Sequence, residues 1–546
     1  MSNRNSKIVL SKNIKMDKRY KQVLSFTEAQ MISLLTHSDN LVYRSLEYSF
    51  IRDRGTIKVN APLNTCIQAN YMAFENPAFS DKWFFAFIDK VVYLSDSACE
   101  IYYTIDEWTT WFDYWDPKQC FILRQHAVTD NVGANTIPEK IETGPYVSNG
   151  NLIGDSRFST YGYIVVLTGP IEAVQMEHLY INMGGTTMNG VCYYTTSMNM
   201  VDTIVKKANE LVNDKPRSEV LYVYMIPTVL IPANHTQGDY GMLLNWDTPY
   251  FASYTPLTVP NTINGYTPVN RKLRTYPYQY LLVENTSGQT NTLRYEFFNG
   301  NPVTFYYYGV PSIGCSIISV PVNYNGEVLA LDEAVVGSKY PVLGWSEDAY
   351  TNWLTENSVN LKQSWIATGL SAVAGVGLTA GGIALSSTGA GAAAGVGMIS
   401  SGVGALINAG TSAFNGAMEY YKHSLEPDVF KGNLNAGDVL TAIGAMGFNY
   451  RPMSIKREYA EIIDRYFTRF GYAYNQVAYP NLQHRENYNY IQIADEENIG
   501  YPNNHGNICV PASSMELINQ IARAGVTVWN NHTNFGNYSV TNAITN

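Results

Sequence analysis

The feature that most constrains this chain is a long segment without any charged side chain, between Lys362 and Glu419. From Trp365 to Phe414 it consists mainly of glycine, alanine, serine and short aliphatic residues, whereas the sequence on both sides is polar and rich in tyrosine. An uncharged stretch of this length is typical of a segment that enters, crosses or lies against a lipid bilayer. The segment therefore predicts a membrane-active region in an otherwise polar protein.

Two apolar arms, 365–385 and 390–414, flank a polar turn at 386–389. Each arm is long enough to span the bilayer as a helix, which takes about 20 residues. The strongly apolar side chains of the first arm contribute roughly −2 to −4 kcal/mol to insertion. Each of its glycines costs a helix about 1 kcal/mol relative to alanine. The balance is near zero, so we expect a segment that is sheltered at first and inserts only conditionally. The residues that we expect to be membrane-active are Trp365, Ile366, Leu370, Val373, Val376, Leu378, Ile383, Leu385, Val396, Met398, Ile399, Val403, Leu406, Ile407 and Phe414.

The segment allows other interpretations. Small residues four apart, such as Gly377 and Gly381, would allow close helix packing in lipid. A flexible Gly/Ala linker remains open, although polar linkers do not normally carry so many aliphatic side chains. A dinucleotide-binding loop at Gly375-Val376-Gly377 is not supported, because no strand precedes it and no acidic residue follows at the required distance.

Strands are expected to dominate the rest of the chain. Tyrosine is abundant at 42 residues, charged residues make up only 15 %, and runs of alternating Val, Ile, Thr and Tyr recur, as is typical of β-structure. At 546 residues the chain is too long for one ordinary core and should form several domains. The fold class is therefore mainly β with a few helices. The expected strands include 7–10, 83–94, 100–105, 161–167, 222–229 and 304–309.

Charge and cysteine content restrict the function and its setting. A net charge of −10 argues against binding nucleic acid by phosphate neutralisation, which needs a basic surface. The six cysteines include no CxxC pair, so neither a zinc site nor a dense disulfide frame is expected. They fit assembly in a reducing cytoplasm. The N-terminus lacks the apolar core of a signal peptide, so Sec export is not indicated. We expect no cofactor and no metal site.

Three segments have the apolar periodicity of helices. In 25–37, Ser25 and Glu28 are spaced as a capping box before the apolar stripe of Met31, Leu34 and Leu35. Residues 515–524 should follow a serine cap at 513 or 514 and end at Gly525. The helix at 457–470 should end at Gly471. Its expected apolar face consists of Tyr459, Ile462, Ile463, Tyr466, Phe467 and Phe470.

Four regions are expected in chain order. Residues 1–150 form an N-terminal β domain, and 151–350 an inserted, β-rich middle region punctuated by turns. Residues 351–425 form the long hydrophobic loop, and 426–546 a C-terminal α+β domain. Both halves pair strands with an amphipathic helix, which suits a duplicated barrel-like unit.

Several short runs occur in order between about residue 60 and residue 530. They are Asp81 to Asp89 (DKWFFAFID), Ile101 to Trp111 (IYYTIDEWTTW), Arg124 to Val128 (RQHAV), Pro138-Glu139, Glu142 to Gly144, Lys272 to Tyr278 (KLRTYPY), Trp345 to Leu354 (WSEDAYTNWL), Ile462 to Phe467 (IIDRYF) and Phe470 to Tyr472 (FGY). Together with the apolar loop, this series resembles the tail knob, or distal tail tube, proteins of small short-tailed phages that infect Gram-positive bacteria.

The resemblance implies a virion tail protein with tail-tube-like β-barrel domains that form a ring of six copies, and it makes 1–150 and 426–546 the tube-forming domains. It implies further partners: the collar or tail tube, the tail tip, and the host cytoplasmic membrane. Phage DNA would pass through the lumen without sequence-specific binding, and a lumen of the same charge sign would repel it rather than retain it. The hydrophobic loops would plug the tube and then emerge to form a pore, which matches Trp365 to Phe414 by position and chemistry.

Three other functions stay open as alternatives. A wall-degrading enzyme could use paired carboxylates at Asp106-Glu107 or Asp495-Glu496-Glu497, although adjacent residues on a strand point to opposite faces. His505-Gly506-Asn507 with Cys509 could belong to a thiol site, although a turn beside a buried cysteine is the simpler interpretation. His126 is expected to be a packed or interface histidine rather than a ligand.

A receptor-binding or wall-binding adhesin is the second alternative, because exposed tyrosine and tryptophan side chains in the middle region, 150–350, could stack on wall sugars. A host-encoded pore-forming toxin is the third, since it would also carry a cryptic glycine-rich hairpin. The order of the tail-knob runs argues against the toxin. No catalytic residue is assigned.

Overall fold

The computed structural model describes residues 7–345 and 446–545, apart from short stretches within these ranges. The exceptions are 52, 77–81, 160, 168, 170, 172–179, 184–185, 190–191, 197–203, 205–206, 209, 213–214, 217–219, 228–239, 244–249, 286–287, 301, 310–315, 341 and 504–507. The chain forms two compact units, each assembled from separate segments. Both consist mostly of strands with a few helices, as the sequence predicted. Unit 1 contains 1–142, 268–273 and 458–546, and unit 2 contains 143–267 and 274–457.

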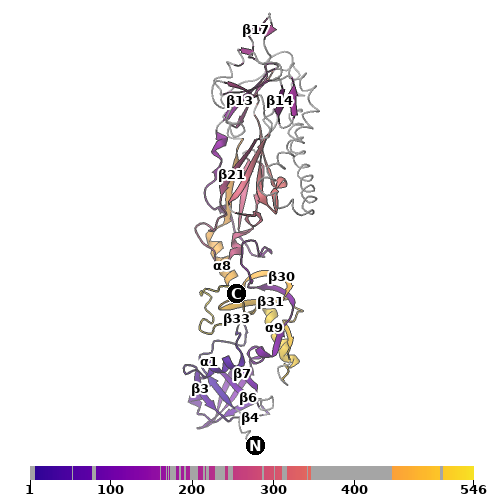
Figure 1. Ribbon diagram of the computed structural model, residues 1–546. Helices are drawn as coiled ribbons and strands as arrows, with labels where there is room; N and C mark the ends of the chain where they lie inside the picture. Colours follow the sequence, from indigo (N-terminus) through magenta and orange to yellow (C-terminus); the bar gives the residue numbers. More distant parts are fainter. Residues whose placement is uncertain are drawn as a thin grey trace. The chain divides into compact units, whose positions relative to one another are not determined.

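Unit 1 contains a seven-stranded antiparallel sheet. Three of its strands, β1, β7 and β8, confirm the predictions at 7–10, 83–94 and 100–105. Helix α1 (Glu28–Thr36) packs on β1 and β6, and Figure 1 shows it beside β3 and β7. In spatial order the strands are β3 (Leu41–Ser45), β1 (Ile8–Ser11), β6 (Tyr71–Asn76), β7 (Lys82–Ser95), β8 (Ala98–Ile105), β5 (Thr56–Val59) and β4 (Ser49–Ile51).

The predicted capping box of the first helix is wrong by two residues. The box is formed by Thr27 and Gln30, whose side chains satisfy each other's backbone N–H groups. Ser25 instead continues the sheet, because its N–H donates to the Trp529 carbonyl at 3.0 Å. Strand pairing therefore delays the start of the helix to Glu28. Met31 and Leu35 are fully buried, as the apolar stripe predicted.

A second, five-stranded sheet completes unit 1. Strand β2 runs parallel to β33, and the remaining pairs are antiparallel. Its spatial order is β2 (Gln22–Leu24), β33 (Val526–Trp529), β31 (Tyr488–Ile493), β10 (Cys120–Gln125) and β30 (Tyr472–Ala478). A separate pair joins β9 (Trp115–Pro117) and β32 (Gly500–Pro502). The further helical segments are α2 (Leu63–Cys66), α3 (Glu107–Trp111), η2 (Phe112–Tyr114), η7 (Arg271–Arg274), α8 (Arg457–Phe470) and α9 (Ala512–Ala524).

Helix α8 has the predicted bounds, and Gly471 ends it with φ +63°. Its buried stripe differs from the predicted face. Ala460, Ile463, Asp464 and Phe467 are buried, whereas Ile462 is 62 % exposed. The buried face includes Asp464 because its carboxylate accepts two backbone hydrogen bonds, which apolar periodicity cannot predict.

Helix α9 ends at Gly525, as predicted, but begins earlier than expected. Pro511 is its N-cap residue, so neither serine caps it, and Ser514 lies buried inside the helix. Proline has a fixed φ that suits the start of a helix, which explains why a proline can replace the expected serine cap. The helix packs on β31, and the two lie close together in Figure 1.

In its described residues, unit 2 contains three larger sheets and two short hairpins. The first sheet is β11 (Tyr146–Ser148), β29 (Phe448–Ile455), β22 (Gln279–Asn285) and β23 (Thr290–Leu293), with β12 (Ile153–Gly154) also on β29. The second is β20 (Tyr240–Leu243), β16 (Cys192–Thr196), β13 (Tyr161–Leu167), β19 (Val220–Pro227) and β28 (Val342–Trp345). The third is β21 (Tyr250–Leu257), β24 (Val303–Gly309), β25 (Ser316–Tyr324) and β26 (Glu327–Leu329), with β27 (Val335–Lys339) on β25.

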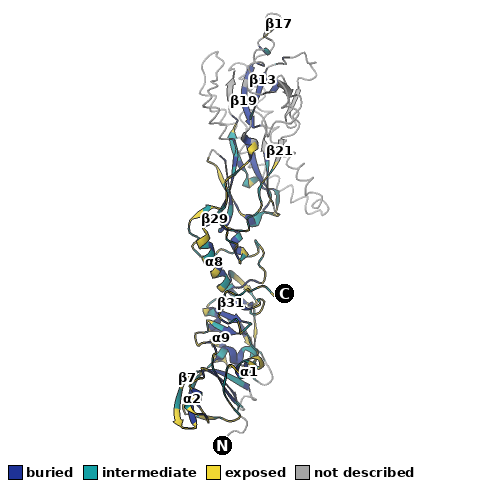
Figure 2. Ribbon diagram, turned by 90° about the vertical axis from the view of Figure 1, so that its left-hand side faces the viewer, coloured by how far each residue is buried: buried dark blue, intermediate teal, exposed yellow. Residues whose placement is uncertain are grey.

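The smaller elements of unit 2 are β14 (Tyr180–Met183), β15 (Thr186–Asn189), β17 (Leu211–Val212), β18 (Lys215–Pro216), η3 (Ser156–Ser159), η8 (Tyr295–Phe297) and η9 (Leu331–Glu333). Strand β22 alternates buried and half-buried residues, so one face packs on the core. Strand β13 is buried along almost its whole length, and Figure 2 shows it and β19 in dark blue. The core between the strands is aromatic, with Tyr307 stacked on Phe448 at 5.6 Å between ring centroids.

The predicted strands at 161–167 and 304–309 are confirmed as β13 and β24, and the one at 222–229 largely as β19. The hydrophobic region 351–425 lies wholly outside the described residues. The four expected regions and the closure of the strands into a ring of barrels stay predictions.

Candidate functional site

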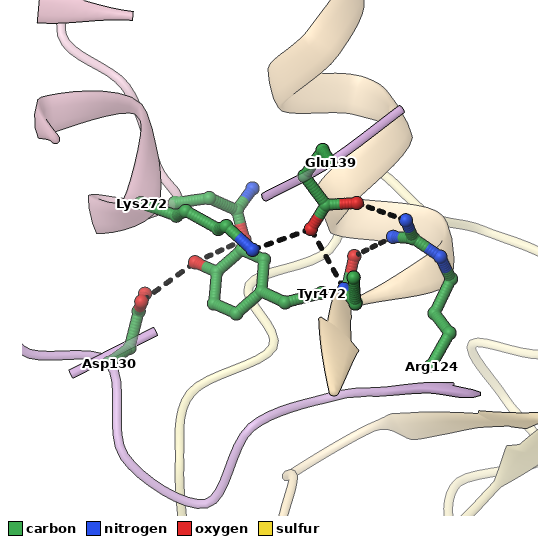
Figure 3. A network of polar contacts seen from close by, with 8 residues as sticks. Arg124, Asp130, Glu139, Lys272 and Tyr472 are labelled. Atoms are coloured by element: carbon green, nitrogen blue, oxygen red, sulfur yellow. Dashed lines mark hydrogen bonds and ion pairs between the residues drawn. The ribbon is translucent and has the colours of Figure 1, made fainter. Parts of the chain in front are cut away.

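A buried group of charged side chains surrounds Glu139 in unit 1 (Figure 3). The Glu139 carboxylate accepts hydrogen bonds from Lys272 Nζ at 2.6 Å and from the Ala473 N–H at 2.8 Å, and it pairs with the Arg124 guanidinium. Only 1 % of the Glu139 side chain and 3 % of the Lys272 side chain are exposed. We call Arg124, Glu139 and Lys272 the Glu139 cluster.

Aromatic rings help to hold both cations of the Glu139 cluster. The Arg124 guanidinium lies 4.8 Å from the Tyr466 ring centroid, and Lys272 Nζ lies 5.2 Å from that of Tyr472. Burial lowers the pKa of Lys272, and the Glu139 carboxylate opposes that shift. Because Glu139 is shared between two cations and a backbone donor, its role is structural and it is poorly placed to accept a proton from a substrate.

The second part of the group attaches residues 268–273 to helix α8. The Asp464 carboxylate accepts hydrogen bonds from the N–H groups of Val269 at 2.8 Å and Asn270 at 3.0 Å. The Asn270 side chain in turn donates to Asp464 and to the Thr468 hydroxyl, each at 2.8 Å. This short segment is thereby fixed through its backbone donors as well as through buried Leu273.

Tyr472 and Asp130 extend these contacts. The Tyr472 hydroxyl donates to Asp130 at 2.7 Å, and Asp130 also accepts from the Arg271 N–H at 3.3 Å. Burial raises the pKa of Asp130, and the hydrogen bonds from Tyr472 and Arg271 lower it. These contacts join the chain after β10, the segment 268–273 and the α8–β30 connection (Figure 3).

Five of the nine runs that carry the family resemblance meet at these contacts, which we call the polar joint. Arg124 to Val128, Pro138-Glu139, Lys272 to Tyr278, Ile462 to Phe467 and Phe470 to Tyr472 each contribute a residue to it. Sequence reasoning assigned no role to Glu139, Lys272 or Asp464. One available signal was an acidic residue inside the apolar stripe of a helix, since a buried charge requires partners.

His126 lies beside this group and is a packed residue, as expected. Its Nδ1 accepts from the Tyr490 N–H at 2.7 Å, so the proton sits on Nε2, which donates to the Thr468 carbonyl at 3.1 Å. Burial, assisted by Arg485, lowers the pKa of His126 to about 3. The imidazole is therefore neutral at physiological pH, and both of its nitrogens are used by the backbone.

The carboxylates at Asp106-Glu107 stabilise helix α3. Asp106 accepts from the Thr109 N–H at 3.2 Å as the helix cap and from the Tyr71 hydroxyl at 2.7 Å. Glu107 accepts from Trp111 Nε1 at 2.9 Å. Burial raises the pKa of Asp106 to about 6, but its side chain has almost no contact with solvent. These contacts explain both acidic residues without catalysis.

The remaining catalytic candidates do not converge on a described site. Asp495 and Glu496 are exposed, as expected of a solvated surface, and the Glu497 carbonyl accepts from Arg523 Nε. Cys509 is exposed rather than buried. The candidates His505, Gly506 and Asn507 lie outside the described residues. Within the described part of the chain no group of acidic, histidine or cysteine side chains is arranged to hold a metal ion.

The predicted membrane-active residues, Trp365 to Phe414, also lie outside the described residues. Of the helices in the described ranges, none combines the length and the apolar character needed to span a membrane.

Comparison with known proteins identifies the family. A family model described as the C-terminal domain of the tail knob protein gp9 of Bacillus phage phi29 matches residues 248–543. The chain belongs to the phage tail knob protein family. A second model, described as the N-terminus of the caudoviral major tail protein, matches residues 4–116. The resemblance seen in the sequence is therefore confirmed.

Relatives and a solved structure agree over nearly the whole chain. Tail knob protein gp9 of phage phi29 is 21 % identical, and that of phage PZA 23 %, each over 96 % of both chains. The protein of phage B103 is 22 % identical over 97 % of both chains. The tail knob protein gp12 of bacteriophage C1 has the same fold, with a TM-score of 0.61 and 13 % identity over 99 % of this chain and 100 % of that one.

Proposed function

We propose that this tail knob protein forms the distal tail tube as a ring of six copies, assembled in the host cytoplasm with the collar or tail tube and tail-tip proteins. In this proposal the segment Trp365 to Phe414 plugs the lumen, is released at the host, and forms a pore in the cytoplasmic membrane through which the genome passes. The observation that carries the proposal is an uncharged segment of near-zero insertion energy inside a tail knob family chain.

Confinement in a ring would make weak insertion effective. Each copy alone has too many glycines for firm insertion, but copies held together act at high effective concentration, as linked binding events do. The net charge of −10 on every copy also suits the passage of DNA, since an acidic lumen repels phosphate. We infer a structural rather than an enzymatic role, in keeping with relatives that are named as tail knob proteins.

An incompletely paired strand supports association between copies. Strand β6 pairs with β7 only along Lys82–Phe87, and the half of β7 that follows pairs with β8. Among the residues that the structure describes, 90–95 have a strand partner on one side only. Tyr93 and Leu94 in this half are 53 % and 42 % exposed. Strand edges of this kind are commonly covered by another chain. Electron microscopy of the purified protein should show six-fold rings or tubes, and monomers alone would contradict the ring.

Dye release from liposomes tests the membrane function. Deleting Thr368 to Ser412 should leave rings that no longer release dye, and unchanged release would refute the pore. Replacing Val376 and Ile383 with aspartate should also abolish release, because each central charge costs about 2.5 to 3.5 kcal/mol on insertion scales. The matched control is Gln363→Glu with Asn415→Asp, which adds the same two charges outside the apolar arms and should leave release intact.

The wall-binding alternative is favoured by a row of aromatic side chains in unit 2. The Tyr280 ring lies 5.4 Å from Tyr146 and 6.0 Å from Tyr276, and the last two residues are 38 % and 39 % exposed. The Arg294 guanidinium lies 4.4 Å from the Tyr276 ring centroid. Aromatic rings with polar neighbours suit sugar polymers.

Sedimentation with purified cell walls tests this alternative. It predicts that Tyr146→Ala with Tyr276→Ala reduces binding to the walls, whereas Tyr501→Ala, at a more exposed tyrosine in unit 1, does not. The same incubation addresses the enzyme alternative. Our proposal predicts no soluble muropeptides, and release that required Asp106 or Glu107 would restore the enzyme.

A further inference from the structure

Two buried cysteines lie in one apolar cluster of the seven-stranded sheet of unit 1. Cys99 on β8 lies directly opposite Val59 on β5, and cross-strand partners point to the same face of a sheet. Ala61 follows two residues later, and its carbonyl lies 3.9 Å from Cys66 Sγ on helix α2. Both thiols are completely buried in the same apolar cluster, and helix α2, which carries Cys66, packs on β8, which carries Cys99.

The other cysteines have different surroundings. Cys120 and Cys192 are buried in two separate apolar clusters, and Cys509 is exposed. Cys315 lies outside the described residues. Proximity therefore selects Cys66 and Cys99 from the described cysteines, although their separation in the sequence gives no indication of it.

We propose that Cys66 and Cys99 are a latent disulfide, reduced when the protein is made and oxidised after it enters an oxidising medium. The oxidant is a small organic disulfide. The Cys66 thiolate attacks it and releases one small thiolate, and the Cys99 thiolate then attacks Cys66 Sγ of the mixed disulfide and releases the second. The two cysteine protons pass to the released thiolates. The protein sulfurs lose two electrons, and the organic disulfide gains them.

Helix α2 controls access to this pair. Burial, followed by the neighbouring Cys99, raises the pKa of Cys66 to about 12, so the thiolate is scarce while the helix is docked. The helix has a single turn, and its N-cap Pro62 provides no side-chain hydrogen bond. Ile67, the residue directly after the helix, is 66 % exposed. A short, weakly capped helix opens at low cost. Oxidation should therefore be slow and limited by opening, and its rate should level off as the oxidant concentration rises.

The setting of this chemistry, but not its geometry, rests on the proposed function. A virion protein leaves a reducing cytoplasm for an oxidising exterior, where disulfides persist. The bond would close a loop that contains β6 and β7 and would tie α2 to β8. Closing such a loop restricts the unfolded chain and should raise the denaturant concentration at which unit 1 unfolds.

The test uses the full-length protein, purified under reductant and then exposed to 2,2′-dithiodipyridine without denaturant. We expect a proteolytic peptide that joins Cys66 to Cys99 and is two hydrogen atoms lighter than the sum of its reduced parts, and we expect its reversal by reductant. Cys66→Ser and Cys99→Ala should each abolish this peptide, whereas the matched variant Cys192→Ser should retain it. Circular dichroism confirms that each variant is folded.

Three results would overturn the proposal: a cross-linked peptide that forms only in urea, Cys66 joined to a different cysteine, or a pair that stays reduced after prolonged exposure. None of these results depends on dye release. The disulfide and the pore can therefore fail separately.

Discussion

Replacing Glu139 with glutamine tests whether the Glu139 cluster holds unit 1 together. The substitution keeps the size of the side chain but removes the charge that compensates Lys272 and Arg124. Arg124 keeps its hydrogen bond to the Gly471 carbonyl at 2.7 Å and is 13 % exposed. Lys272 is 3 % exposed and loses an ion pair of 2.6 Å. Breaking a buried ion pair from one side costs about 3 to 5 kcal/mol, and we expect a loss of unfolding free energy in that range.

The loss should depend on pH in a defined direction. Lys272 already has a lowered pKa because of burial, and removing the Glu139 charge takes away the largest effect that raises this pKa. In the variant, the pKa of Lys272 is lower in the folded state than in the unfolded state, where it is about 10.4. At every pH between these two pKa values, the unfolded chain binds a proton that the folded chain has lost. Stability rises with pH where the unfolded state binds more protons. The deficit of Glu139→Gln should thus shrink between pH 7 and pH 9.5.

Urea unfolding followed by tryptophan fluorescence measures these changes, since Trp108, Trp111 and Trp529 are buried in unit 1. Asp17→Asn is the matched control. It breaks the Asp17–Arg19 pair, whose side chains are 50 % and 83 % exposed, and should cost less than about 1 kcal/mol.

Combining Glu139→Gln with Lys272→Met should recover part of the loss, because no buried lysine then stays uncompensated. A loss below about 1 kcal/mol for Glu139→Gln, or a deficit that does not change with pH, would refute the electrostatic argument.

Three further predictions concern unit 1. Burial lowers the pKa of His126 in the folded state to about 3, so its contribution to stability is complete above pH 6.5 and is lost as the pH falls. Below pH 6.5, the free energy of unfolding of the wild type in urea should fall by about 1.4 kcal/mol per pH unit more steeply than that of His126→Gln. Gly471→Ala would place Cβ 2.2 Å from the Gln125 carbonyl, whereas Gly55, with nearly the same φ, has open space; calorimetry should show about 1 kcal/mol lost for Gly55→Ala and roughly 2 kcal/mol more for Gly471→Ala. Ile463→Ala should cost about 2 to 5 kcal/mol in urea unfolding and Ile462→Ala less than about 0.5 kcal/mol, and equal costs would contradict the observed face of α8.

Sequence periodicity predicted those helices and strands that local sequence features are enough to define. Helix α8 has the predicted bounds, because an apolar stripe and a terminal glycine suffice to define it. Strands β7, β8 and β13 were found from β-branched and aromatic alternation for the same reason. The family was recognisable because many modest matches occur in the right order, although no relative exceeds 23 % identity among those compared.

Features that depend on distant partners were missed. The start of α1 is set by the pairing of Ser25 with Trp529, which are about five hundred residues apart. The exposure of Ile462 follows from the burial of Asp464, whose donors come from Val269 and Asn270. Local propensity contains no information about such partners, so tertiary contacts override it.

The polar joint around Glu139 and Asp464 is better explained by specificity than by stability. A buried ion pair is on average no more stabilising than well-packed apolar side chains of the same size. Residues 268–273, however, form a short segment of unit 1, and the chain on both sides of it, 143–267 and 274–457, belongs to unit 2. The segment must therefore return to one position in unit 1. Apolar contacts allow a segment to shift along its neighbours. The N–H groups of Val269 and Asn270 both donate to the Asp464 carboxylate, and the Lys272 ammonium donates to Glu139. These hydrogen bonds can all form in only one register. The polar joint therefore fixes the position of residues 268–273. The need for one position explains why five of the family-like runs contribute residues to it.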